Sequence, residues 1–260
     1  NRDLLRLDPW ALEIEPDPEA DEPLARAFAA VLDTYAERPP LEVDARVQLP
    51  AGAGLGCSAA IGVAVLDAID GALGRSRSRE ELGEAALTWE EVFHGNPSGI
   101  DNTMSAVGGV AWFRRGEPLR ALDANKPLHL VVGFSGVSSS TKEMVSSVRR
   151  QLEQDEERVR QAFDGIETLV RNAKLAIEAG DLIALGQLLD LNHTLLSSLM
   201  LCTTKLDEMC QTARAAGALG AKMTGAGGGG CMFALAPKRE EAERLREVLG
   251  DAAFVAEVSA

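Results

Sequence analysis

The sequence has 260 residues and a formal net charge of -14, and 46% of its residues are hydrophobic. This length suffices for one large or two modest domains. The negative charge argues against nucleic acid and against an anionic membrane surface as partners, because both reward clustered lysine and arginine. The sequence shows neither a charged, apolar, small-residue leader nor a run of about 18 apolar residues that could span a bilayer, so it predicts a cytoplasmic protein.

The cysteines and histidines do not have the spacing of a zinc or redox site. The four cysteines form no C-x-x-C pair, and the three histidines show no H-x-x-x-H spacing. We therefore expect the thiols to pack as small apolar groups, and a divalent metal held by oxygen ligands stays open.

The first part of the chain alternates predicted strands with predicted helices. Prolines make residues 1–21 irregular apart from an extended piece at 10–15, and a helix follows over 22–36. Residues 41–49 alternate strictly between apolar and polar side chains, which predicts a half-buried antiparallel strand. A helix over 58–73 comes next.

The following helix begins with a capping box, since Ser78 is followed three residues later by Glu81, and it ends at His94. At about 100° per residue, Glu90 falls at the edge of its apolar stripe and Glu91 on the opposite face. The sequence therefore predicts that Glu90 points inward or into a cleft and Glu91 into water.

The second half of the chain reads as strands around a long helical region. That region covers 142–201, with breaks near Gly165 and Gly180, and another helix begins at Thr204. Strands are expected before it, at 108–113 and 128–134. A strand at 231–235, a helix at 239–249 and a strand at 253–258 close the chain.

Three glycines alternate between residues 50 and 58, where the strand gives way to the helix. A chain without side chains there can bring several backbone N–H groups close to one anion, and the following helix adds the positive end of its dipole. The spacing fits neither the Walker pattern nor the dinucleotide fingerprint. A tight turn is the alternative, but the sequence favours a different kind of phosphate loop.

A second glycine-rich segment covers residues 222–231. A flexible linker is the alternative interpretation. An apolar strand begins at Cys231 and leaves no room for a tether, so we favour a second structured loop.

The loop over residues 94–102 is dense in turn formers and polar side chains. Asp101 could be a cap for the next helix. Next to a phosphate loop, its carboxylate could instead orient an attacking hydroxyl and accept the proton, while Glu90 and Ser58 could hold Mg²⁺.

These motifs carry a family resemblance. Residues 50–60 resemble the second motif of the galactokinase, homoserine kinase, mevalonate kinase and phosphomevalonate kinase superfamily, and residues 222–231 resemble its third. The loop over 94–102, with Glu90 eleven residues before Asp101, is similar to the mevalonate kinase family within it. The similarity covers most of the chain from Leu41 onward.

The resemblance implies a two-domain α+β small-molecule kinase of the GHMP type, with the active site in the cleft between the domains. An N-terminal ribosomal-protein-S5-like domain would cover residues 1–125 and a C-terminal ferredoxin-like domain residues 126–260. The implied reaction is ATP-dependent phosphorylation of mevalonate to 5-phosphomevalonate in isoprenoid biosynthesis, with ATP and Mg²⁺, and a homodimer stays open.

The resemblance also implies a role for individual residues. Asp101 would be catalytic, and Ser58 and Glu90 would ligate Mg²⁺. The ATP phosphates would be held by Pro50, Gly52, Ala53, Gly54, Leu55, Gly56, Cys57, Ser58, Gly225, Ala226 and Gly227. The substrate would be bound by His94, Gly99, Asp101 and Thr141.

The sequence departs from the family at two places. The family usually has Ser where this chain has Cys57, which is tolerated if the position supplies mainly its N–H. Family members also begin with a strand and loop resembling P-G-K-V-x-L-x-G-E-H, whose Lys pairs with the catalytic Asp, and nothing like it precedes Leu41. We therefore expect the encoded protein to have several tens of residues upstream that contain this lysine.

Two further functions stay as alternatives. One is a kinase of the same fold that phosphorylates another small alcohol, such as a sugar or phosphomevalonate. The other is a non-catalytic nucleotide-binding homologue, which the presence of Ser58, Glu90 and Asp101 disfavours.

Overall fold

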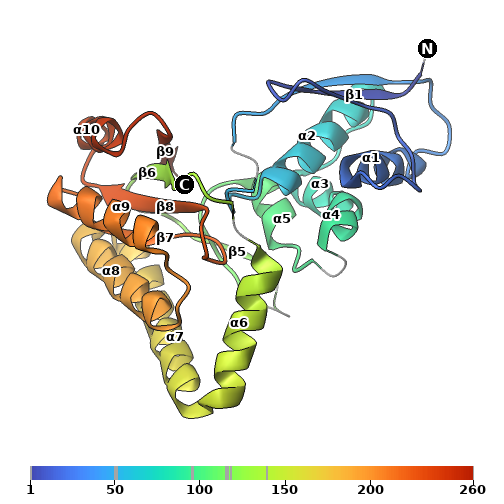
Figure 1. The fold of residues 1–260 in the computed structure, drawn as a ribbon. Helices are drawn as coiled ribbons and strands as arrows, with labels where there is room; N and C mark the ends of the chain where they lie inside the picture. Colours follow the sequence, from blue (N-terminus) through green and yellow to red (C-terminus); the bar gives the residue numbers. More distant parts are fainter. Residues whose placement is uncertain are drawn as a thin grey trace. The chain divides into compact units, whose positions relative to one another are not determined.

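The computed structural model describes residues 2–49, 52–94, 97–114, 117, 119–138 and 140–259, and the chain divides into two compact units (Figure 1). The first unit comprises residues 1–49, 56–108 and 113–119, and the second comprises 50–55, 109–112 and 120–260. The division falls within the first glycine-rich stretch, between Leu55 and Gly56. Helices and sheets occur in both units, so the predicted α+β class is confirmed.

The first unit contains a sheet with the strand order β2-β1-β3. Its strands are β1 (Leu4–Asp8), β2 (Leu12–Ile14) and β3 (Glu42–Arg46). The alternation predicted for β3 is confirmed, but its antiparallel direction is wrong, because β3 pairs parallel with β1. Alternation reports that one face of a strand is buried, which is common in antiparallel sheets but does not fix the direction of the partner strand.

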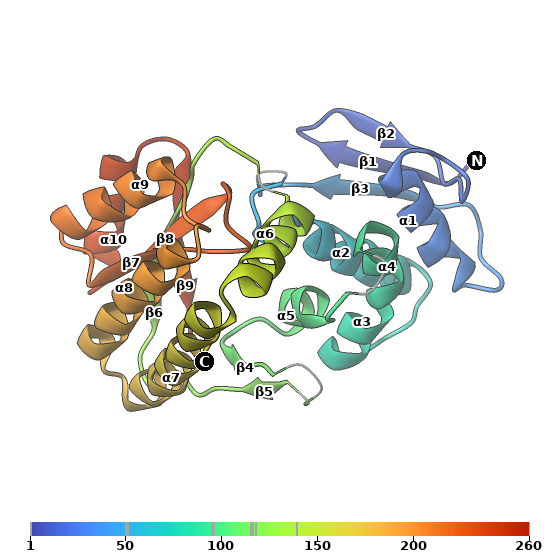
Figure 2. The ribbon, with the colours of Figure 1, turned by 60° about the horizontal axis from the view of Figure 1, so that its bottom comes forward.

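Helices cover the apolar face of this sheet (Figure 2). Leu5, Leu7 and Val43 pack into one core with Phe28, Leu66 and Trp89. The helices of the unit are α1 (Pro23–Asp33), α2 (Cys57–Ala72), α3 (Arg79–Ala85), α4 (Leu87–His94) and α5 (Ile100–Val107).

The single helix predicted to end at His94 is two helices, because the chain turns at Ala86 between α3 and α4. Its start is confirmed. The Ser78 side chain accepts a hydrogen bond from the Glu81 N–H, and the Glu81 carboxylate accepts one from the Ser78 N–H. Ala86 is fully buried, so the turn keeps the apolar stripe in the core.

The second unit is built on an antiparallel sheet with the strand order β7-β8-β6-β9. Val131 and Ala253 point to one face and pack against α10, whereas Leu128 and Leu235 point to the other and pack against α7 and α8. The strands are β6 (Leu128–Phe134), β7 (Gly220–Met223), β8 (Cys231–Ala236) and β9 (Ala253–Val258), with a small separate pair, β4 (Ala111–Trp112) and β5 (Arg120–Ala121).

The helices of the second unit are α6 (Thr141–Gln154), α7 (Glu156–Ala179), α8 (Leu182–Ser198), α9 (Thr204–Ala215) and α10 (Arg239–Leu249). The break predicted near Gly180 is confirmed, but the one near Gly165 is wrong. The chain breaks instead at Asp155, whose side chain accepts a hydrogen bond from the Arg158 N–H and caps α7. A Cβ at Gly165 would lie 3.0 Å from Leu195 Cδ1, so this glycine lets α7 and α8 approach closely.

A matched pair of glycines in α2 separates packing from helix propensity. A Cβ at Gly62 would lie 2.6 Å from Trp89 Cγ in the core, whereas a Cβ at Gly71 would meet nothing within 4 Å. We expect Gly62→Ala to lower the free energy of unfolding by about 1–3 kcal/mol through overpacking. Gly71→Ala should raise it by up to about 1 kcal/mol, since alanine restricts the unfolded chain more than glycine does. Chemical denaturation of both variants measures these changes, and equal effects would contradict the packing argument.

Candidate active site

The helix α2 begins without a side-chain cap. Its N-cap residue is Gly56, in the left-handed conformation with φ of 66°. The first-turn N–H groups of a helix have no partner within the helix, and the dipole places positive charge there. The start of α2 therefore presents first-turn amides of the kind that the predicted phosphate loop needs.

A buried carboxylate lies beside this helix start. The Ser58 hydroxyl donates a hydrogen bond of 2.7 Å to Glu90 Oε1, and Trp89 Nε1 donates one of 3.3 Å to Ser58 Oγ. Glu90 is 2% exposed and Glu91 is exposed, as predicted from the helix faces. The other carboxylate oxygen of Glu90 lies 3.4 Å from His94 Nε2, one turn further along α4.

Asp101 lies in the first turn of α5, next to the start of α2. A Cβ built on Gly56 would lie 3.8 Å from Asp101 Cβ and 3.9 Å from its carboxyl carbon. The alternative that Asp101 caps α5 is wrong, because the N-cap is Gly99, with φ of 79°. The Asp101 side chain is exposed, whereas the neighbouring Asn102 is buried and donates a hydrogen bond to the Gly83 carbonyl. Asn102 thus ties α5 to α3 and leaves Asp101 free to meet a ligand.

In the second unit, the two glycine-rich segments contact each other. A Cβ at Gly225 would lie 3.3 Å from the carbonyl oxygen of Gly54, and both glycines have positive φ. Next to them, Ala53 is buried with Val132 and Cys231. A side chain at Gly225 would crowd the Gly54 carbonyl, so the close approach of the two backbones depends on glycine at position 225.

The rest of the second glycine-rich segment is held by backbone hydrogen bonds. The N–H of Gly228 donates to the Leu201 carbonyl at 2.8 Å, and the N–H of Gly230 donates to the Val137 carbonyl at 2.7 Å. A Cβ at Gly227 would lie 2.3 Å from the Leu201 oxygen. The flexible-linker interpretation is therefore wrong, and the segment is a structured loop.

The predicted site residues divide between the two units, and each group is described within its own unit. Pro50 lies outside the described residues, as do Gly95 and Asn96 of the loop after α4. The first unit holds Gly56, Cys57, Ser58, Glu90, His94, Gly99 and Asp101. The second holds Gly52, Ala53, Gly54, Leu55, Thr141, Gly225, Ala226 and Gly227, with Thr141 exposed at the start of α6.

Cys57 is placed as a backbone donor rather than as a nucleophile. It is the first residue of α2, and burial raises the pKa of its thiol, so the thiol stays protonated. The Cys57 side chain lines a cavity of about 210 Å³ between the end of β3 and the first turns of α2. The departure from serine at this position still leaves a backbone N–H in the first turn of α2.

Sequence reasoning missed two side chains near the glycine segments. A Cβ at Gly52 would lie 3.0 Å from Ser138 Oγ, so Ser138 borders the phosphate loop, and the serine-rich turn before α6 was the available signal. Lys222 opens the second glycine-rich segment, and its Nζ donates to the Met223 carbonyl at 2.7 Å and lies 5.3 Å from the centre of the Phe233 ring. Burial lowers the pKa of Lys222 to about 8.

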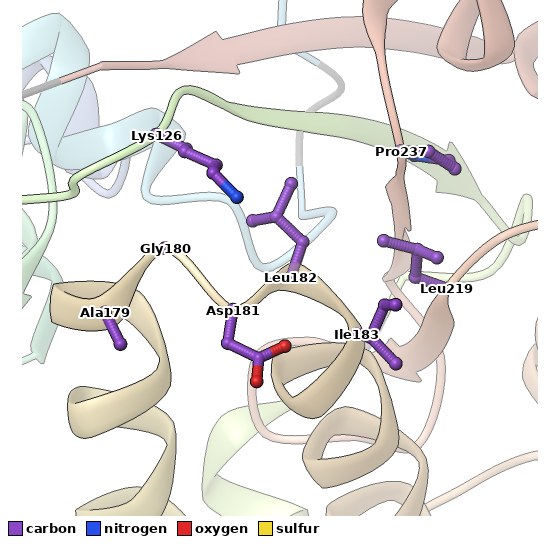
Figure 3. A pocket seen from close by; sticks show the side chains of 8 residues that line it. All are labelled: Lys126, Ala179, Gly180, Asp181, Leu182, Ile183, Leu219 and Pro237. Atoms are coloured by element: carbon purple, nitrogen blue, oxygen red, sulfur yellow. The ribbon is translucent and has the colours of Figure 1, made fainter.

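A further cavity, of about 490 Å³, shares no residue with the predicted site. It lies at the start of α8, where the Lys126 and Leu182 side chains reach toward each other and Leu219 and Pro237 form a wall (Figure 3). The Asp181 carboxylate accepts a hydrogen bond from the Ala184 N–H and so caps the helix. The glycine loops and the carboxylates of α4 and α5, rather than this cavity, carry the candidate chemistry.

Comparison with known proteins agrees with these motifs. The family described as "GHMP kinases N terminal domain" matches residues 23–109, and "GHMP kinases C terminal" matches residues 173–256. The mevalonate kinase of Pyrococcus horikoshii is 41% identical over 241 residues, which cover 90% of this chain and 71% of the relative. The mevalonate kinase of Pyrococcus abyssi is 39% identical over 239 residues, with the same coverage of 90% and 71%.

Solved structures show the same similarity. The crystal structure of L. major mevalonate kinase in complex with R-mevalonate superimposes with a TM-score of 0.87 at 27% identity. The match covers 98% of this chain and 82% of that chain.

The contact between Gly54 and Gly225 gives a direct test of whether the two glycine-rich segments bind phosphates together. We expect Gly225→Ala to weaken triphosphate binding by about tenfold, because the new Cβ pushes on the Gly54 carbonyl. Gly217→Ala is the matched control, since Gly217 also has positive φ but open space around its Cβ position. Both variants should lose about 1–2 kcal/mol of stability from the left-handed backbone. Calorimetric titration with ATP measures the affinity of both variants, and equal affinities would contradict the expected effect of Gly225→Ala.

Proposed function

Since this chain belongs to the mevalonate kinases of the GHMP kinase family, we propose that its own residues transfer the terminal phosphoryl group of ATP to the 5-hydroxyl of mevalonate. It is a transferase of the mevalonate pathway, which leads to isoprenoids. The fold predicted for such kinases, an S5-like N-terminal and a ferredoxin-like C-terminal domain, is confirmed. The domain boundary between residues 125 and 126 stays a prediction.

The observation that carries the proposed mechanism is the position of Asp101 beside Gly56. It brings a carboxylate that is open to solvent to the helix start that offers amides to an anion. In phosphoryl transfer the protein mainly positions the reactants and stabilises charge, so this juxtaposition is what the reaction needs.

In the proposed reaction the α2 amides and Asp101 each have one role. The first-turn amides of α2, including those of Cys57 and Ser58, bind the phosphates of ATP. Asp101 accepts a hydrogen bond from the 5-hydroxyl of mevalonate and directs its oxygen at the γ-phosphorus. A new bond forms between that oxygen and phosphorus as the bond to the bridging oxygen of ADP breaks. The hydroxyl proton passes to Asp101, and ADP leaves with the electron pair.

The pair of Ser58 and Glu90 fits a magnesium ion. Among the described residues, no group of three or more His, Cys, Asp or Glu could hold a metal. Mg²⁺ with a nucleotide needs only one or two protein oxygens, because phosphates and waters fill the other positions. Ser58 Oγ and Glu90 Oε1 lie 2.7 Å apart, and a buried carboxylate favours a cationic partner. Mg²⁺ would neutralise the charge that develops on the phosphates.

The glycine loops of the second unit support the proposed binding of phosphates. Gly225 lies against the Gly54 backbone, and Gly52 lies beside the Ser138 hydroxyl. We assign Ala53, Leu55, Ala226 and Gly227 to the same loops, where they shape the backbone.

The remaining assignments follow the motifs. We propose that His94, Gly99 and Thr141 bind mevalonate, with His94 also paired to the Glu90 carboxylate. In the part of the chain that the structure describes, every helix is too short or too polar to span a bilayer. A cytoplasmic location and a homodimer stay predictions.

A coupled assay of ADP release tests the proposed function, with mevalonate, phosphomevalonate, galactose and homoserine as acceptors. We expect release to depend on mevalonate. Asp101→Asn should keep ATP affinity nearly unchanged and lower turnover by at least ~10²-fold, since the amide cannot accept the proton. Activity with the other acceptors but not with mevalonate would overturn the substrate assignment. A variant as active as the wild type would remove Asp101 from the mechanism.

The neighbouring glutamates of α4 provide a matched test of the metal site. Glu90→Gln should raise the Mg²⁺ concentration needed for half-maximal activity by about tenfold or more, because a neutral amide binds Mg²⁺ less strongly than a carboxylate does. Glu91→Gln removes the same charge from the exposed face and should change it little. A titration of activity against Mg²⁺ at fixed ATP measures both variants, and equal shifts would rule out a special role for the inward position.

A further inference from the structure

The strand β7 stands at the end of the strand order in the described part of the chain, and side chains cover its outer edge. The Ala221 N–H donates to Asp190 Oδ1 at 2.8 Å, and Arg214 Nη2 donates to the Ala221 carbonyl at 2.7 Å. The Met223 N–H donates to His193 Nδ1 at 3.2 Å. These side chains, from α8 and α9, take the place of a neighbouring strand on polar groups that an edge strand leaves unpaired.

His193 is held in one tautomer by this arrangement. Its Nδ1 accepts a hydrogen bond from the Met223 N–H, so Nε2 carries the proton. The Nε2–H group donates a hydrogen bond of 3.2 Å to Asp207 Oδ1. The imidazole is 4% exposed, and burial lowers its pKa, with Arg214 and Lys222 acting in the same direction against Asp207. Cys202 Sγ lies 3.8 Å from Nε2. The neutral imidazole is therefore the form that bonds the strand.

The bonded strand leads directly into the second glycine-rich loop. Thr224 follows Met223 and donates its N–H to the Cys231 carbonyl at 3.0 Å, and Gly225 comes next. A Cβ built on Gly225 would lie 3.3 Å from the Gly54 carbonyl oxygen of the predicted phosphate loop. Only Thr224 stands in the sequence between the strand residue held by His193 and the glycine that contacts this loop.

We infer that His193, oriented by Asp207, is a positioning residue for ATP binding: it fixes the end of β7 and thereby the contact of Gly225 with the phosphate loop. The inference rests on the proposed function, in which that loop holds the ATP phosphates. His193 acts through the backbone of Met223 and touches no substrate.

Two substitutions at His193 and one control test this inference. His193→Ala removes both hydrogen bonds. His193→Gln restores an oxygen that can accept from Met223 and an amide that can donate to Asp207. Leu245→Ala is the control, because Leu245 is buried on α10 with Val131 and Ala253 and tests lost stability alone. The affinity for ATP is measured by calorimetry, KM for ATP and for mevalonate by ADP release, and stability by thermal unfolding.

We expect His193→Ala to raise Kd and KM for ATP about tenfold, with KM for mevalonate within about twofold of the wild-type value. His193→Gln should return ATP binding to within about threefold, whereas Leu245→Ala should lower the unfolding midpoint without changing Kd. Unchanged ATP binding in a folded His193→Ala would overturn the inference and leave the proposed function standing. Equal losses of ATP affinity in Leu245→Ala and His193→Ala would also overturn the inference. If His193→Ala does not fold, His193→Phe, which keeps the ring volume without nitrogen, replaces it under the same criteria. A wild-type protein that binds no ATP would overturn the proposed function itself.

Discussion

The structure of the site depends on two helices that begin without side-chain caps. The N-cap residues of α2 and α5 are Gly56 and Gly99, both in the left-handed conformation. Because glycine has no side chain, neither helix start has a side-chain cap. Several other helices close their first turn with their own side chains, at Glu22, Ser78, Ser140, Asp155, Asp181 and Thr203. Glycine in place of a capping side chain costs only roughly a few tenths of a kcal/mol, so these starts lose little stability and leave their first-turn amides available to a ligand. They carry Ser58 and Asp101, the two side chains nearest to the proposed chemistry.

The buried carboxylate adds a second cost at the same place. Transfer of an ionised carboxylate from water into a protein core is unfavourable unless it is paired. Glu90 has a hydroxyl donor and a histidine one turn away, and Trp89, which is fully buried beside it, fixes the position of Ser58 by a hydrogen bond. The core of the first unit thus sets the position of Ser58 and Glu90, the pair proposed to bind the metal, because the indole that fills the core also orients the hydroxyl.

The sequence predicted several features that depend on neighbours along the chain, although it missed the local breaks at Ala86 and Asp155, and it failed on features that depend on distant partners. Helix faces and the capping box at Ser78 follow from local spacing, which is why the inward direction of Glu90 could be predicted. The direction of β3 could not, because its partner β1 was not recognised as a strand. Gly165 was misread as a breaker because its role, close contact with Leu195, lies on a helix that comes later in the chain.

The same distinction explains the site. The glycine pattern predicted two phosphate-binding loops, whereas the contact of Gly225 with Gly54 required the fold. The strand β7 was missed because its four residues, Gly-Ala-Lys-Met, show little apolar alternation, and its outer edge pairs with side chains rather than with a strand. The spacing around His193 does not predict its contacts, since Met223 and Asp207, which its ring nitrogens bond, stand 30 and 14 positions after it.

The net charge of the chain makes these local arrangements necessary. With a formal charge of -14, the overall field opposes the approach of a triphosphate, and the site itself adds Glu90 and Asp101. Attraction must then come from short-range donors, and backbone amides at a helix start keep their partial charge whatever the side chains around them. Amides bind an anion well only if they converge, and glycines with positive φ allow the backbone turns that lead into α2 and through the second glycine-rich loop. In the first unit Trp89 holds Ser58 by a hydrogen bond, and in the second unit the side chains along the edge of β7 hold the strand that leads to Gly225, so each group of proposed phosphate-binding residues depends on packing outside its own glycines.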